Sequence, residues 1–96
     1  MTRLLWLFND KDSEPYLTGS FLPLVREIPG TDGVSLLRVT ASGMGEFPAR
    51  FVVEARFETE DGMNDALATA EGRRVSREIM ESAGKGMEVV TLEVMD

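Results

Sequence analysis

The chain has 96 residues, of which 43% are hydrophobic and 28% are charged, and its formal net charge is -7. This length allows a single globular domain over residues 1–96, and so small a domain buries a modest share of its surface, which favours self-association. The acidic balance argues against nucleic-acid binding, because binding to phosphates relies on clustered Lys and Arg. The sequence contains no Cys, which excludes disulfides, thiolate nucleophiles and Cys-based metal sites.

The apolar segments are too short for a membrane-spanning protein. No apolar run approaches the ~20 residues that would cross a bilayer. The opening segment, residues 1–8, is soon followed by Asp10 and lacks the small-residue cleavage site of a signal peptide. We therefore expect a cytoplasmic protein with no membrane partner.

The first segments of the chain predict a strand followed by a turn. Residues 3–9 form a dense apolar run without polar alternation, which is typical of a central strand covered on both faces. A polar turn follows, in which Ser13 or Asp12 is placed to cap a helix that begins with Glu14 and Pro15. The acidic residues of this turn lack the spacing of a cation-binding loop, so we predict no metal site.

An amphipathic helix is predicted to run from this turn to residue 28. Its apolar residues recur at spacings of four, three and four, which places them on one buried face: Leu17, Phe21, Leu24 and Ile28. Pro23 lies inside the run and is expected to kink the helix or divide it into two. The Pro29-Gly30 pair then ends the helix.

The remaining segments complete the predicted fold. Residues 34–41 and 50–58 predict strands joined by a loose hairpin, and a helical region opened by Thr59 or Glu60 is interrupted at Gly72. Residues 87–95 predict a last strand. The order strand, helix, strand, strand, helix, strand predicts an α+β, ferredoxin-like βαββαβ fold, with a four-stranded antiparallel sheet and the helices on one face.

Two stretches carry a family resemblance. The pattern F-L-P-L-V-R-E-I-P-G over residues 21–30 resembles the EthD family of small proteins, named for a role in ether degradation, whose members have an H-x-P-L core in this helix. Phe21 stands where that family has histidine, and this chain contains no His. The stretch T-A-E-G-R-R over residues 69–74 is similar to the family's second helical region. The resemblance implies a dimeric α/β barrel, in which the open sheet faces of two chains pack together.

The strand patterns also predict a homodimer. We expect the helices to cover a face built from Leu37, Val39, Phe51, Val53, Ala55, Phe57, Val90, Leu92 and Val94. The opposite, open face would then carry Leu36, Arg38, Val52, Glu54, Arg56, Val89, Thr91 and Glu93. This face is apolar across its middle and balanced in charge, so Arg38, Glu54, Arg56 and Glu93 are predicted at the dimer interface. The alternative is the solvated face of an ordinary antiparallel sheet.

Aromatic residues are the candidates for a ligand site, which the family resemblance places between the sheet and the first helix. The predicted lining residues are Trp6, Phe8, Tyr16, Phe21 and Phe57. The alternative is that most of them form ordinary core. Asn9 and Tyr16 are the best polar candidates, because they lie at the end of a central strand and at the start of the adjacent helix. Related cofactor-independent oxygenases of this architecture use asparagine, tryptophan and tyrosine or histidine, which makes Asn9, Trp6 and Tyr16 candidates for catalysis without a match in spacing. The alternative for them is a turn or capping role.

These residues leave three functions open. The first is binding of a small hydrophobic or aromatic compound, and the second is cofactor-independent catalysis of oxygenase or isomerase type on an aromatic or polyketide-like substrate. The third is a purely structural, accessory dimer. Phe21 argues against histidine-type catalysis, because a phenyl ring neither transfers a proton nor binds a metal. No cofactor is implied.

Overall fold

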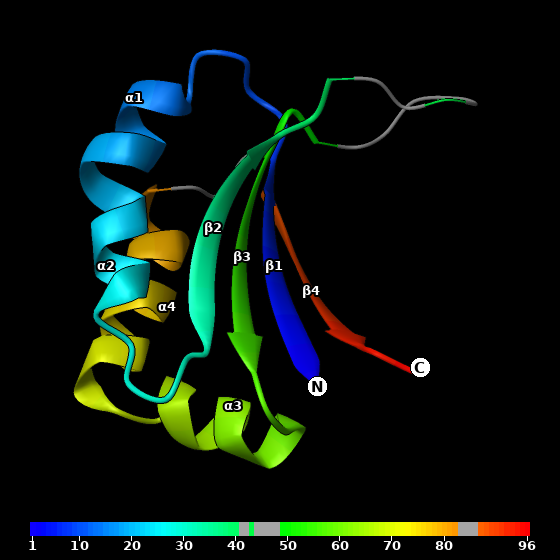
Figure 1. The fold of residues 1–96 in the computed structure, drawn as a ribbon. Helices are drawn as coiled ribbons and strands as arrows, with labels where there is room; N and C mark the ends of the chain where they lie inside the picture. The colour runs from blue at the N-terminus through cyan, green and yellow to red at the C-terminus, as the bar shows by residue number, and fades with distance from the viewer. Residues whose placement is uncertain (41–42, 44–48, 83–86) are drawn as a thin grey trace.

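The computed structural model describes residues 1–40, 43, 49–82 and 87–96 of the chain. Its elements, in chain order, are β1 (Thr2–Phe8), α1 (Glu14–Tyr16), the π-helix η1 (Leu17–Phe21), α2 (Leu22–Arg26), β2 (Gly33–Arg38), β3 (Phe51–Phe57), α3 (Glu60–Leu67), α4 (Ala70–Ser82) and β4 (Met87–Glu93). The strands form one antiparallel sheet in the order β2-β3-β1-β4, and the helices form a layer on one of its faces (Figure 1). The predicted α+β, ferredoxin-like fold is confirmed.

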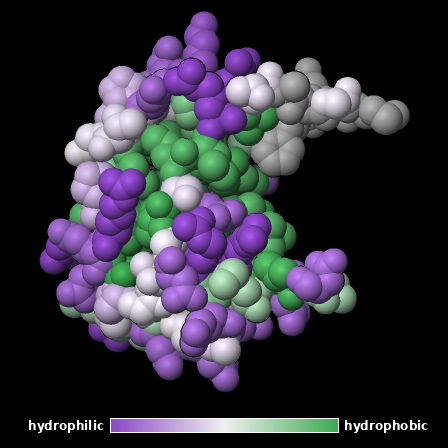
Figure 2. Space-filling model, viewed as in Figure 1, coloured by the Kyte–Doolittle hydropathy of each residue, from purple (hydrophilic) through white to green (hydrophobic). Residues whose placement is uncertain are grey.

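The predicted elements are all present, and their core lies between the sheet and the helices. Apolar side chains gather between the helical layer and the strands, whereas polar side chains cover the outer surface of the helices (Figure 2). The expected hairpin over residues 42–48 and the expected helix end at residues 84–86 lie outside the described residues, apart from Gly43. Among the described residues, no helix is both long and apolar enough to cross a membrane.

The first helical region contains one turn that is wider than an α-helix. Within η1 the backbone N–H of Leu22 donates to the carbonyl of Leu17, five residues back. Pro23 follows at once and has no N–H with which to continue the ordinary α-helical pattern from Gly19. The predicted effect of Pro23 therefore takes the form of a π-turn, with the chain helical on both sides of it.

The π-turn changes which residues face the sheet. An extra residue in the turn rotates the following helix by about 100° relative to a regular α-helix. Leu17, Phe21 and Ile28 are buried as predicted, whereas Leu24 is only partly buried and Val25 is fully buried in its place. The sequence spacing assumed an unbroken α-helix, so the prediction for Leu24 is confirmed only in part: its side chain packs against the core without being fully buried.

The second helical region breaks at Ala68 and Thr69, rather than at Gly72. The Thr69 hydroxyl donates to the carbonyl of Ala66 at 2.6 Å and accepts the backbone N–H of Gly72 at 3.1 Å, so this one side chain closes α3 and opens α4. Thr59 opens α3 in the same way, accepting from the N–H of Gly62 at 3.0 Å. Gly72 lies inside α4, where the helix crosses closely over the end of α3.

The faces of the strands differ in part from the prediction. On β3, the buried residues Phe51, Val53, Ala55 and Phe57 face the helices as expected. On β2, however, Leu36 pairs with Val53, and on β4 Val89 pairs with Trp6, so these residues also face the helices. The predicted faces of β2 and β4 were therefore wrong: Leu37, Val39, Val90 and Leu92 lie on the open face. Both strands carry apolar residues on both sides, so their alternation does not select one face.

We predict that Gly72→Ala destabilises the protein by about 1–3 kcal/mol, because the new methyl group overpacks a closed helix crossing. A Cβ atom at Gly72 would collide with the carbonyl oxygen of Ala66 and lie 2.5 Å from Cα of Leu67. Gly19→Ala is the matched control, since its Cβ would meet no atom within 4 Å. Urea unfolding should show the control to be neutral or slightly stabilised. Equal stability of the two variants would contradict the close crossing.

Candidate functional site

Phe21 lies at the centre of an aromatic cluster. Its side chain is 0% exposed, and the rings of Trp6 and Phe8 meet it edge to face with centroids 5.6 and 5.3 Å away. The ring of Tyr16 stacks on it at 6.2 Å. Phe57 is also buried in this core. The place where the family resemblance expects a histidine and an adjoining cavity is therefore packed with aromatic rings, which strengthens the contact between η1 and β1.

An apolar cleft lies on the same side of the sheet, beside α4 and β4. Its volume is about 240 Å³, and it is lined by Leu4, Trp6, Leu67, Ser76, Ile79, Met80 and Val89. Although Val89 faces the helix layer, it is 50% exposed, and Met80 is 82% exposed. The helix layer therefore leaves part of β4 uncovered, and the cleft opens there. It is suited to a small hydrophobic molecule, since such sites are mostly apolar with a few polar groups.

The sequence analysis found one member of this cleft. Trp6 lines it, whereas Phe8, Tyr16, Phe21 and Phe57 do not belong to its lining. Sequence reasoning missed the other lining residues, because they come from β1, α3, α4 and β4 and only the fold brings them together. Met80 lies on the outward side of α4 and is 82% exposed, a position that its spacing in the sequence did not indicate.

The polar candidates Asn9 and Tyr16 lie apart from the cleft. Asn9 is exposed at the end of β1. Tyr16 is partly buried, and its hydroxyl donates to Oε1 of Glu78 at 2.9 Å, which ties the start of the first helical region to α4. This bond gives Tyr16 a structural role between two helices. Its role in catalysis, like that of Asn9, stays a prediction.

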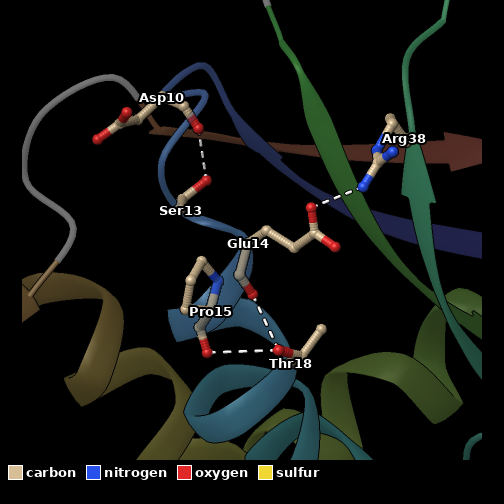
Figure 3. A network of polar contacts seen from close by, with 6 residues as sticks. All are labelled: Asp10, Ser13, Glu14, Pro15, Thr18 and Arg38. Atoms are coloured by element: carbon tan, nitrogen blue, oxygen red, sulfur yellow. Dashed lines mark hydrogen bonds and ion pairs between the residues drawn. The ribbon is translucent and has the colours of Figure 1, made fainter.

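The turn before α1 holds a polar network (Figure 3). The hydroxyl of Ser13 donates to the carbonyl of Asp10 at 2.6 Å, and the hydroxyl of Thr18 donates to the carbonyl of Glu14 at 3.0 Å. Ser13 occupies the N-cap position of α1 but makes no capping bond through its side chain, so its predicted capping role was wrong. No group of three or more acidic side chains among the described residues is arranged to hold a metal ion.

Arg38 belongs to this network. Its Nη2 atom lies 2.6 Å from Oε1 of Glu14 (Figure 3). Its guanidinium group also lies over the ring of Phe51, 5.8 Å from the centroid. Arg38 therefore faces the helices. By its pairing with Thr2, Glu93 also lies on the helix side of the sheet. The prediction that these two residues share the open face with Glu54 and Arg56 was wrong.

Glu54 and Arg56 do lie on the open face, where they form an ion-pair cluster. Nη1 of Arg56 lies 2.6 Å from Oε1 of Glu54 and donates to the hydroxyl of Ser35 at 3.2 Å. Oε2 of Glu54 is 3.9 Å from Nη1 of Arg3. Gly33 makes room for the cluster, since a Cβ atom there would collide with the guanidinium group of Arg56. The cluster is an ordered polar patch at one end of the open face.

The other part of the open face is apolar. Leu7, Ala49 and Val52 are buried there, and three partly buried residues pack against them: Leu5, Val39 and Val90. Leu37 and Leu92 lie on the same face and are 46% and 44% exposed. An apolar surface of this kind, bordered by charged residues, is typical of a protein interface.

Comparison with known proteins supports the resemblance. No family model matches the sequence, and no curated protein matches it by sequence. In structure, the chain is similar to an EthD family protein of Bacillus halodurans, with 25% identity, 99% of each chain covered and a TM-score of 0.86. It is also similar to a dimeric ferredoxin-like protein of unknown function from Thermobifida fusca, with 17% identity, 97% and 90% coverage and a TM-score of 0.65.

A third similar structure is that of an antibiotic biosynthesis monooxygenase, with 15% identity, 100% of each chain covered and a TM-score of 0.62. At this identity the similarity shows the fold alone. Together, these comparisons confirm that the chain has the EthD-like, ferredoxin-like fold predicted from its sequence. They do not assign a reaction to it.

We predict that Phe21→His costs about 1–3 kcal/mol of stability, because a polar ring would be buried among three aromatic side chains. Phe21→Leu, which keeps the site apolar, is the comparison variant and should cost less. Urea unfolding of both variants measures the difference. If the His variant were as stable as the unchanged protein, the site around Phe21 would have to be an open cavity.

Proposed function

We propose that the protein is a cytoplasmic homodimer that binds a small hydrophobic or aromatic compound in the cleft between the sheet and α4. The observation that carries this proposal is the cleft itself, with its apolar walls and a volume of about 240 Å³. This proposal moves the ligand away from the first helix, since the aromatic rings around Phe21 occupy the place expected from the sequence.

The open face of the sheet supports the homodimer. Leu7, Ala49 and Val52 are already buried in the single chain, so the gain comes from exposed apolar residues of this face, such as Leu37 and Leu92. Removing these residues from water would stabilise a pair of chains by about 25 cal/mol for each Å² of apolar surface that is buried. Arg56 and Arg3 both pair with Glu54, which leaves a net charge of +1 in this cluster, so a second copy meets only a small excess of one sign. The similar protein from Thermobifida fusca is described as dimeric.

Catalysis remains the alternative function. The bond from the Tyr16 hydroxyl to Glu78 joins two groups that exchange protons in many enzymes, and the fold is shared with an antibiotic biosynthesis monooxygenase. The pair lies outside the cleft lining, however, and the chain has no His. We therefore favour binding without turnover. Turnover of a bound compound that is lost in Tyr16→Phe would favour catalysis instead.

We predict that the protein sediments at about twice its chain mass of 10.6 kDa at micromolar concentration. Leu92→Glu should shift it towards the monomer, because a carboxylate would be buried at the proposed interface. The control is Met95→Glu, which alters a residue that is 93% exposed and lies beyond β4. A monomer in the unchanged protein would overturn the dimer.

We also predict that small aromatic compounds raise the melting temperature, because binding to the folded state stabilises it. Met80→Glu should abolish this increase by placing a charge in the cleft wall. The control is again Met95→Glu, which makes the same change outside the cleft and should keep the increase. A screen in which no compound stabilises the protein would favour the accessory, structural dimer.

A further inference from the structure

Met80 belongs to the cleft and is also open to solvent. It lies on α4, lines the cleft and is 82% exposed. Other lining residues lie deeper, since Leu4 and Trp6 are each 3% exposed. Met80 therefore forms the outer part of the cleft wall, where water and dissolved reagents reach its side chain directly.

The composition of the chain makes methionine the sulfur group that peroxides attack. The sequence has six Met and no Cys, so all of its sulfur atoms are thioethers. Their access to solvent differs widely: Met63 is 4% exposed in the core, whereas Met80 and Met95 are 82% and 93% exposed. A thioether reacts when the oxidant reaches it, so Met80 and Met95 should react well before Met63. Of these three residues, Met80 is the one in the cleft wall.

From this placement we infer that Met80 is a site of reversible oxidation by hydrogen peroxide, and that its oxidation weakens ligand binding in the cleft. The inference rests on the proposed function and concerns the regulation of that site. In the reaction, a lone pair of the sulfur attacks one oxygen of the peroxide, and an S–O bond forms as the O–O bond breaks. The departing hydroxide takes the proton from the transferred oxygen and leaves as water. The thioether is oxidised to a sulfoxide, and the peroxide is reduced.

The sulfoxide changes the polarity of the cleft wall. It replaces an apolar thioether by a group whose oxygen accepts hydrogen bonds from water. An apolar compound in the cleft would displace this water without offering a donor, which makes binding less favourable. Because Met80 is mostly exposed, the new oxygen remains hydrated in the free protein, so we expect the fold to keep its stability.

The test uses protein labelled with ¹³C in its Met methyl groups and indane, an apolar aromatic compound, as the probe. NMR spectra of this protein report oxidation, since the sulfoxide moves the methyl carbon signal, and binding, since indane should shift the signal of Met80. Peroxide treatment should weaken indane binding by about threefold to tenfold and leave the melting temperature of the free protein nearly unchanged. Methionine sulfoxide reductases for both sulfoxide epimers should restore the affinity.

Two matched variants identify the residue that is responsible. Met80→Leu keeps an apolar side chain of similar size without sulfur, so it should bind indane within about twofold of the unchanged protein. Its affinity should then resist peroxide. The control is Met95→Leu, which removes the other highly exposed thioether and lies beyond β4. The affinity of this control should still fall after peroxide treatment.

The outcomes separate this inference from the proposed function. Loss of affinity after peroxide treatment in the unchanged protein and in Met95→Leu, but not in Met80→Leu, would support both. Unchanged affinity after oxidation of Met80, an equal loss in Met80→Leu, or oxidation of Met63 as fast as that of Met80 would overturn the inference and leave hydrophobic binding in the cleft intact. Absence of indane binding to the untreated protein, up to the solubility of the probe, would overturn both.

Discussion

The contact of Phe21 with the two aromatic rings of β1 is the interaction on which the rest of the structure depends. It joins the helix layer to the central strand, and it involves side chains that are almost wholly buried. The π-turn ahead of Pro23 supports this contact, because it allows Leu17, Phe21 and then Val25 to face the sheet in succession. Aromatic pairs of this geometry contribute about 0.5–1.5 kcal/mol each beyond the burial of their surface.

The same contact determines on which side of Trp6 the apolar cleft lies. Since Phe21 fills the space beside the first helical region, the apolar cleft lies at the other side of Trp6, towards β4. Trp6 therefore has two environments: one side of its ring belongs to the core, and another borders the cleft. A histidine in place of Phe21 would have been the natural candidate for acid–base chemistry, whereas a phenyl ring can neither donate nor accept a proton.

The sequence predicted the fold more fully than the site. Element order followed from local signals, such as the turn residues at 29–33 and the alternation of β3, in which charged residues on one side identify the buried side. β2 and β4 lack that signal, since Leu36 and Leu37, like Val89 and Val90, place apolar side chains on both faces. Their register is decided by pairing with β3 and β1, which the sequence does not reveal. The cleft was missed for the same reason, because four separate elements form it.

β1 also keeps the two proposed binding surfaces apart. Along this strand Leu4 and Trp6 face the helices and the cleft, whereas Arg3, Leu5 and Leu7 face the open side of the sheet. Since successive side chains of a strand point to opposite faces, a ligand at Trp6 and a second chain at Leu5 would never touch. Backbone pairing on both sides of β1 holds the strand in one register, and a shift of one residue would exchange the two sets of side chains. The proposed ligand binding and the proposed self-association would therefore depend on the same strand through different residues, so each would be open to change by substitution without loss of the other.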